Sequence, residues 1–199
     1  MRISPGLISL AFMATSFADA PRSRAQNQTQ NRILATTPGE AHIVKDVRHN
    51  LLMLPYYSIF DDISFSVNGS VVTLEGECPS GPPFDIKSDA AATVKQVKGV
   101  TQVINNIKEL PVSPMDDQIR RAEARAIYGD QEIGMRYGYQ ALPSIHIIVD
   151  NGHVTLKGVV DNQMDDTMIR LRANQVPNVF SVTDNLVIQN QGKKEVPGK

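Results

Sequence analysis

The first regular pattern of apolar residues in the chain has helical spacing. Ile43, Val47 and Leu51 recur every four residues, which predicts an amphipathic helix over about residues 40–53. Pro55 follows and cannot continue a helix, because it lacks a backbone N–H. The predicted fold therefore begins with one helix that turns an apolar face toward a core.

Apolar residues next alternate with polar ones, as in a half-buried strand. In "ISFSV" the side chains of Ile63, Phe65 and Val67 lie on one face of the predicted sheet. Asn68 and Gly69 then supply the positive φ that a tight hairpin turn needs. We expect a second strand to follow the turn and to pair with the first.

A second helix and a third strand complete this pattern. Helical spacing resumes after a proline-rich loop, and Gly99 ends the helix because glycine readily adopts left-handed backbone geometry. The next residues, "VTQVINNI", predict a strand. The helical stripe consists of Ile86, Ala90, Val94 and Val97.

The same order of elements occurs a second time. The hairpin "VNGSVVTLEG" of residues 67–76 returns as "VDNGHVTLKG" in residues 149–158. Because strand–helix–strand connections are right-handed crossovers, the second and third strands of each copy should be parallel. We predict an α/β sandwich of the α+β class, made of two tandem αββαβ modules over residues 40–111 and 114–190. Each should have a three-stranded mixed sheet with two helices on one face. The repeated landmarks are Asn68, Gly69, Gly76, Gly99 and Asn106 in the first copy and Gly152, Gly158 and Asn185 in the second.

The helices expected in the second copy have weaker apolar stripes, and a longer loop over about 130–143 separates the first of them from the hairpin. Asp116 precedes Arg120 by four residues, and Asp117 precedes Arg121 by four, which predicts intrahelical ion pairs. The expected inner stripes are Met115, Ile119, Ala122 and Ala126 in the first helix and Met164, Met168, Leu171 and Gln175, with Ile169 beside them, in the second.

Charge and composition exclude some classes of function. The formal net charge of −1 argues against a dedicated nucleic-acid-binding protein, and no run of about 18 apolar residues is present to cross a bilayer. Residues 1–20 have the pattern of a secretory signal peptide, with cleavage after Ala18 or Ala20. We expect a periplasmic or exported protein with a disordered leader over 21–39 and a disordered tail over 191–199.

The histidines form no strong metal-binding pattern. His42 and His49 share a solvent-facing arc of the first helix with Asp46, but about 10.5 Å of helical rise keeps the two imidazoles from one ion. His146 and His153 lie in the second hairpin and could be cross-strand neighbours, yet two imidazoles without further ligands make a weak site. We predict no bound metal and no cofactor.

The remaining candidates for chemistry also favour structural roles. The single cysteine, Cys78, lies beside Glu77, whose charge should raise the thiol pKa and lower its reactivity. It can form a disulfide only with another chain. Helix-dipole placement explains the acidic pairs Asp116–Asp117 and Asp165–Asp166 better than catalysis does. We therefore predict that the protein is not an enzyme and has no catalytic residues.

The repeated motifs resemble those of the BON family, bacterial modules named for an osmotic-stress protein and nodulation proteins. The resemblance covers about residues 40–190 and rests on "VTLEG" and "VTLKG", each followed by a helix and then by "GV..V.N.I" or its variant "NV..V.DNL". Asn178 stands where the first copy has Gly99, and asparagine also tolerates left-handed geometry. The resemblance implies a non-catalytic tandem envelope module, often active in stress protection, that contacts phospholipid surfaces or envelope partners.

Aromatic residues supply the candidate contact surface. All five tyrosines fall at or after the first helix of a copy, and their amphipathic rings suit interfaces and lipid headgroups. The alternative is that these rings close the ends of the two cores. Arg172 has no acidic residue four positions before it, which leaves it freer to meet an anionic headgroup. The predicted surface is Tyr56, Tyr57, Phe60, Tyr137, Tyr139 and Arg172. Its expected partner is a membrane phospholipid surface or an envelope protein, and the alternative function is an adaptor in a larger envelope complex without lipid binding.

Overall fold

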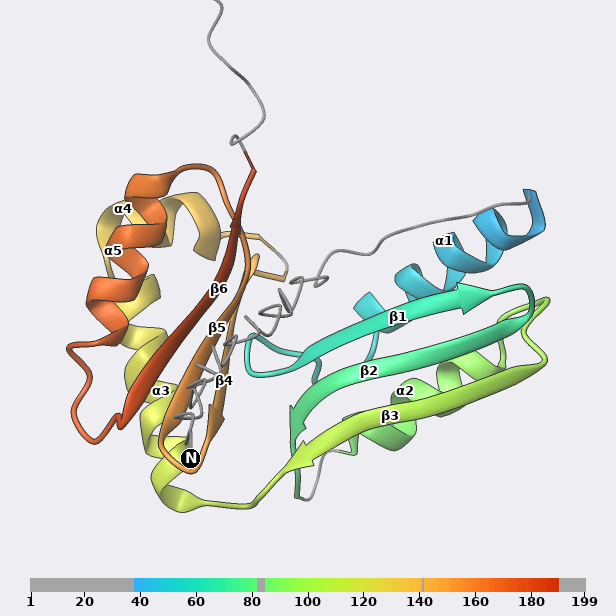
Figure 1. Cartoon of the computed structure of the whole chain (residues 1–199), viewed down its shortest axis with the longest axis horizontal. Coiled ribbons are helices and arrows are strands. Elements are labelled where there is room, and N and C mark those ends of the chain that lie inside the picture. The colour runs from blue at the N-terminus through green and yellow to red at the C-terminus, as the bar shows by residue number, and fades with distance from the viewer. Residues whose placement is uncertain (1–37, 82–84, 141, 190–199) are drawn as a thin grey trace, which may run out of the picture.

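The computed structural model describes residues 38–81, 85–140 and 142–189 (Figure 1). The predicted signal peptide, the tail and almost all of the predicted leader lie outside these residues. Two successive αββαβ units are present, and we call residues 38–110 module 1 and residues 114–188 module 2. No helix in the described part of the chain has the length and apolar character to cross a membrane.

The two modules share an order of elements, and module 2 has one extra helical segment before its hairpin. Module 1 contains α1 (Pro38–Leu52), β1 (Asp62–Asn68), β2 (Val71–Pro79), α2 (Ile86–Lys95) and β3 (Gln102–Leu110). Module 2 contains α3 (Pro114–Tyr128), α4 (Gln131–Ile133), the π-helical turn η1 (Gly134–Gly138), β4 (Ile145–Asp150), β5 (His153–Val160), α5 (Gln163–Ala173) and β6 (Ser181–Ile188).

Each module has a three-stranded mixed sheet, in the order β1-β2-β3 or β4-β5-β6. The first two strands of each sheet are antiparallel and the last two are parallel. Val72 pairs with Val103 and Val154 pairs with Val182, so the repeated hairpins occupy equivalent places. In Figure 1, α1 and α2 lie on one face of the first sheet, and α3 and α5 lie on one face of the second. The predicted fold class and tandem repeat are confirmed.

A carboxylate from the first helix of module 1 binds the hairpin turn. Asn68 and Val71 form the last strand pair, so the turn is Gly69–Ser70 and not Asn68–Gly69 as predicted. Gly69 has a positive φ of 61°. Its amide donates a hydrogen bond to Glu40 Oε1 of α1 (2.8 Å), which ties the start of the helix to the tip of the sheet.

In module 2 the carboxylate of Asp116 on α3 binds the hairpin turn in the equivalent way. Its turn is Asn151–Gly152, with positive φ at both residues (51° and 78°), as a type I′ turn requires. The amides of Asn151 and Gly152 donate to the Asp116 carboxylate at 3.0 and 2.8 Å. The predicted Asp116–Arg120 ion pair is therefore wrong, because the turn occupies Asp116. Arg120 instead pairs with Asp117 (2.6 Å) and donates to a backbone carbonyl of β4.

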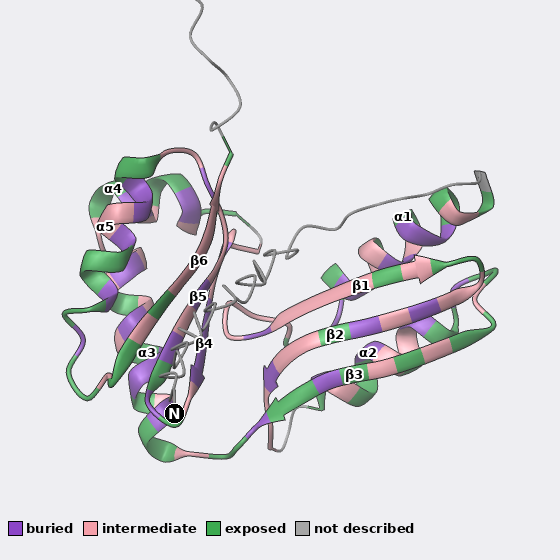
Figure 2. Ribbon diagram, in the orientation of Figure 1, coloured by how far each residue is buried: buried purple, intermediate pink, exposed green. Residues whose placement is uncertain are grey.

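The buried helix faces match the prediction in module 1 and differ from it in module 2. Both predicted stripes of module 1 pack into its core. In module 2 the predicted stripes are right for Ile119, Ile169 and Met168, which pack into the core. They are wrong for Met115, Met164 and Leu171, which are exposed. Charged residues occupy part of the buried face of α3 and α5, whose buried positions are purple in Figure 2. The apolar pattern alone therefore points to a neighbouring face of each helix. The residues that are buried are Asp116, Ile119, Arg120, Glu123 and Ile127 on α3 and Asp165, Asp166, Ile169 and Ala173 on α5.

A segment of module 1 covers the edge of the second sheet. β4 is an edge strand, and its Ile147 amide donates to the carbonyl of Ile59 at 2.7 Å. The neighbouring His146 Nδ1 lies 2.5 Å from the carbonyl oxygen of Asp61. Ile59 and Phe60 pack against the core of module 2. The connection after α1 therefore serves as part of both modules.

Ion pairs across the junction hold the modules in this arrangement. Lys157 of β5 donates to Asp62 (2.8 Å) and Glu77 (3.3 Å) of module 1, and all three side chains are mostly buried. Lys108 of β3 makes a more exposed pair with Asp150 at 2.8 Å. Buried, hydrogen-bonded charges of this kind constrain geometry more than they add stability.

Glycine at two equivalent positions lets β2 and β5 pass close to their partner strands. Gly76 and Gly158 have φ of 129° and 128°. A Cβ atom there would lie 1.9 Å from the carbonyl oxygen of Asp62 or Ser144, respectively. Both the backbone conformation and the space therefore require glycine.

We expect Gly158→Ala to destabilise the protein by at least about 3 kcal/mol, since it combines a strained φ with a backbone collision. Gly76→Ala should act similarly. Gly39→Ala is the matched control, because a Cβ atom at Gly39 would meet no atom within 4 Å and the φ there is ordinary. Urea unfolding measures all three, and equal stability of Gly158→Ala and Gly39→Ala would contradict the close approach.

Candidate functional site

The aromatic residues predicted in module 1 lie at the junction between the modules. Tyr57 is half-buried beside His146, with ring centroids 6.1 Å apart, and its hydroxyl oxygen accepts from the Ile63 amide at 3.5 Å. Burial raises the pKa of Tyr57. Phe60 packs on the core of module 2, whereas Tyr56 is 65% exposed with a positive φ of 69°. In this group only Tyr56 offers a largely open ring.

Tyr137 is a core residue, so its prediction as a contact residue was wrong. It is buried, and its hydroxyl donates to Asp165 Oδ2 at 2.5 Å and accepts from the Asp161 amide at 2.9 Å. Burial raises its pKa to about 12. Arg136 and Asn162 also donate to Asp165. The η1 turn therefore points this ring inward and anchors itself to α5.

Two residues of the η1 segment, by which we mean residues 134–139, point outward. Tyr139 is 86% exposed and Met135 is 66% exposed. They border a shallow pocket of about 620 Å³ that is also lined by Tyr128 and Pro143. Tyr128 is fixed there by a hydrogen bond from its hydroxyl to the Ile145 carbonyl (2.5 Å). A rigid base thus presents two large apolar side chains to solvent.

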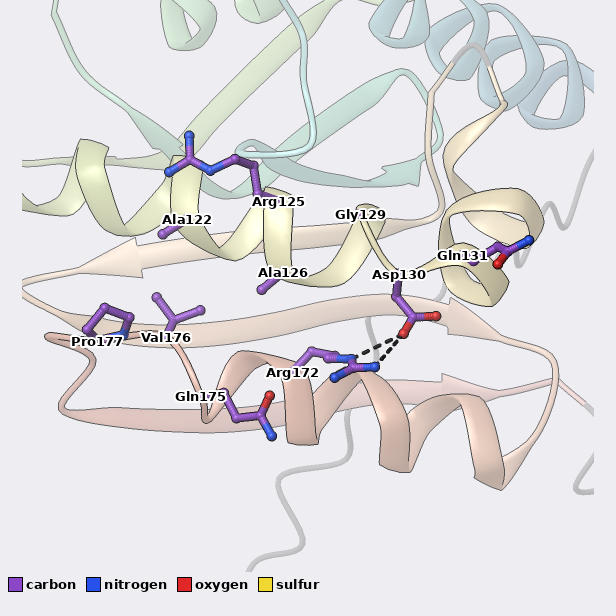
Figure 3. Close-up of a pocket in the computed structure, with 10 residues that line it drawn as sticks. All are labelled: Ala122, Arg125, Ala126, Gly129, Asp130, Gln131, Arg172, Gln175, Val176 and Pro177. Carbon is purple, nitrogen blue, oxygen red and sulfur yellow. Dashed lines mark hydrogen bonds and ion pairs between the residues drawn. The ribbon is translucent and has the colours of Figure 1, made fainter.

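A groove of about 560 Å³ between α3 and α5 adjoins this pocket (Figure 3). Arg172 lines this groove but is not free to meet an anionic headgroup, contrary to the prediction. Its Nε and Nη2 donate to Asp130 Oδ2 at 3.2 and 2.7 Å. The hydrogen bonds from Arg172 lower the pKa of Asp130, which also caps α4. Figure 3 shows the Arg125 guanidinium directed away from Arg172, so the two cations do not converge on one anion. Ala122 and Ala126 keep the floor of the groove shallow.

The histidines lie apart from one another. His42 is exposed and pairs with Asp46 at 3.2 Å. His146 and His153 are not cross-strand neighbours, because the register places them opposite Lys157 and Asp150. Within the described residues, no three His, Cys, Asp or Glu side chains form a group that could hold a metal ion.

Buried titratable groups were largely missed by the sequence patterns. Burial, more than any neighbouring charge, raises the pKa of Cys78 to about 11, so the expected direction was right but its expected cause, Glu77, was not. Asp61 is buried at the junction, where Ser58 donates to its carboxylate. Glu123 is buried in module 2. Aligning the first helices of the two copies would have revealed Glu123 at a core position.

Substitution of the two tyrosines of the η1 segment should change the stability of the protein to very different extents. Tyr137→Ala removes a buried ring and leaves Asp165 with fewer partners, which should cost about 3–5 kcal/mol of stability. Tyr139→Ala should change stability by about 0.5 kcal/mol or less, because its ring is exposed. Thermal unfolding followed by circular dichroism tests this contrast. Similar losses in both variants would show that Tyr139 also packs into the core.

Comparison with known proteins identifies the repeated unit. The BON domain model matches residues 39–111 and 116–190. Two solved structures of CdsD, a structural protein of the type III secretion system of Chlamydia trachomatis, are each 13% identical to this chain and cover 73% of it. The structure of the CdsD C-terminal domain has a TM-score of 0.29, and the match covers 96% of its chain. The other structure has a TM-score of 0.27, and the match covers 91% of its chain. A search of curated proteins found no match. Because the family model covers most of the sequence in two copies, the chain belongs to the BON domain family and carries two BON domains in tandem.

Proposed function

We propose that this protein is a non-catalytic, exported binding protein that contacts a phospholipid surface of the cell envelope peripherally, in envelope or osmotic stress protection. Membership of a family of envelope-associated binding modules supports the general role. We assign the contact to module 2, through Met135 and Tyr139. The other predicted contact residues contribute less, because Tyr57 and Phe60 pack at the junction and Tyr137 is in the core.

The observation that carries this proposal is the pair of outward side chains on the η1 segment. Met135 and Tyr139 are exposed, while the segment itself is anchored by Tyr137 and Arg136 to Asp165. Tyrosine rings favour the depth of lipid headgroups, and methionine adapts to irregular apolar surroundings. A fixed base with exposed apolar tips is the arrangement expected of a shallow membrane contact.

The expected contact is weak. Full burial of two such side chains contributes roughly 3–6 kcal/mol, which corresponds to dissociation constants no tighter than about 40 μM. The exposed Arg125, which lines the adjoining groove, adds only modest attraction, because the net charge of the chain is −1. Stable attachment therefore needs several protein copies or a second binding partner.

The alternative function is an adaptor in the assembly of a larger envelope complex. The observation in its favour is that, within the described residues, β3 and β6 each end a sheet, with a neighbouring strand on one side only. Such edges can accept an extended segment of a partner through main-chain hydrogen bonds. A partner bound in this way would not need Met135 or Tyr139.

Met135→Ser with Tyr139→Ser should weaken binding to phosphatidylglycerol–phosphatidylethanolamine vesicles at least about tenfold, because it removes both apolar tips. Vesicle co-sedimentation of the purified protein measures this. Val112→Ser is the matched control, since Val112 is 71% exposed but lies in the linker between modules. Its binding should equal that of the unchanged protein.

Equal vesicle binding by the double variant would refute the assigned contact residues. An unchanged protein that ignores vesicles but retains specific proteins from envelope extract, in amounts reduced by substitutions along β3 or β6, would support the adaptor function instead.

A further inference from the structure

The two copies of the repeat differ at one fully buried position. The helices α1 and α3 both have 15 residues and both begin with proline, so they align without gaps. This alignment places Glu40 with Asp116, the two acids that bind the hairpin turns. It also places Val47 with Glu123, and neither side chain has exposed surface. Module 2 thus carries a carboxyl group where module 1 carries an isopropyl group.

No described group stabilises the charge of Glu123. Neither carboxyl oxygen has a hydrogen-bond partner among the described residues. Burial raises its pKa to about 8, from an ordinary value of 4.5. No neighbouring charge contributes to this shift. On α3 itself, Arg120 pairs with Asp117 and the Val149 carbonyl, although its Nε has no partner among the described residues, and Tyr128 binds the Ile145 carbonyl. On the elements packed against α3, His146 binds the Asp61 carbonyl, and Arg136 and Tyr137 bind Asp165.

A second difference between the copies also replaces a neutral group by an acid. Asn105 and Asp184 occupy equivalent positions, and each accepts a hydrogen bond from the amide two residues later. The Asn105 amide group also donates to the Lys87 carbonyl of α2 at 2.9 Å. An ionised aspartate cannot donate such a bond. The third strand of module 2 therefore lacks this hold on its helix, unless a neighbouring protonated group donates to Asp184.

Asp166 of α5 can supply that proton. Asp166 is buried, and its pKa is raised by burial and then by the charge and hydrogen bond of Asp184 on β6. Arg170 and a hydrogen bond from Gln163, both on α5, offset this only in part. Two carboxyl groups in contact favour retention of one proton between them.

We propose that the helical layer of module 2 is a proton-dependent element: α3 and α5 are held on the sheet while Glu123 and Asp166 retain their protons, and they loosen as the pH rises. Module 1, with Val47 in place of Glu123 and Asn105 in place of Asp184, remains closed over the same range. The inference rests on the fold of module 2 and is independent of lipid binding.

The direction follows from proton counts. Between pH 4.5 and about 8 an unfolded Glu123 has lost its proton, whereas the folded form keeps it. The stabilisation is therefore complete below the unfolded pKa and decreases as the pH rises toward the folded pKa. For one such group the opening equilibrium rises by up to about tenfold per pH unit. Because Arg136 and Tyr137 attach η1 to Asp165 of α5, loosening of α5 also frees the segment that bears Met135 and Tyr139.

Amide hydrogen exchange of the full chain at pH 5.5 and 7.5, corrected for intrinsic exchange rates, tests this proposal. Protection of α3 and α5 should fall at least about tenfold more than that of α1 and α2, which serve as the control within the molecule. Glu123→Val with Asp184→Asn, which copies module 1, should remove this difference. Glu123→Gln provides a nearly isosteric second variant that cannot ionise, and it should also reduce the difference.

Parallel loss of protection in both modules would overturn the proposal. So would a pH dependence of α3 and α5 that is unchanged in Glu123→Gln and in the double variant. Vesicle binding is not part of this readout, so failure of the proposed function would leave the result interpretable.

Discussion

The arrangement of this protein depends on one constraint, which is the need to cover the unpaired backbone groups of the edge strand β4. An edge strand presents unpaired backbone groups, which must be covered or left to pair with another chain. Here the segment after α1 covers it, with the Ile147 amide bonded to the Ile59 carbonyl and with Phe60 packed on the second core. Lys157 adds ion pairs to Asp62 and Glu77 on the adjoining face. Module 1 is thereby fixed against the β4 edge of the second sheet (Figure 1).

This docking determines which surfaces remain available. The aromatic residues that follow α1 are mostly used at the junction, whereas the η1 segment of module 2 remains open and presents Met135 and Tyr139. The two copies thus share a fold and differ in role. Module 1 supplies the cover for β4 and a helix layer with Val47 where module 2 has Glu123, and module 2 supplies the proposed contact and the buried acids. Divergence of two copies within one chain allows such specialisation without a change of topology.

The sequence was sufficient for the topology, because the hairpin motifs, the glycines that permit close strand approach and the helix stripes of module 1 all follow simple periods. It failed where charged residues are buried: Asp116 and Glu123 interrupt the apolar stripe of α3, and the apparent stripe shifts to a neighbouring face. Tyr137 and Tyr139 are two residues apart, and the π-helical turn that sends one inward and the other outward has no clear sequence signal. The contacts at the junction could not be predicted, since they join segments about 90 residues apart, such as Ile59 and Ile147.

The central claim is that module 2 meets the membrane through the η1 segment. Paramagnetic broadening of the amide NMR signals by spin-labelled phospholipid in nanodiscs measures proximity at every residue at once. The account predicts the strongest broadening at Met135 and Tyr139, weaker broadening along the groove near Arg172, and little in α1 or α2. Strongest broadening at Tyr56, or broadening that is uniform over both modules, would contradict it.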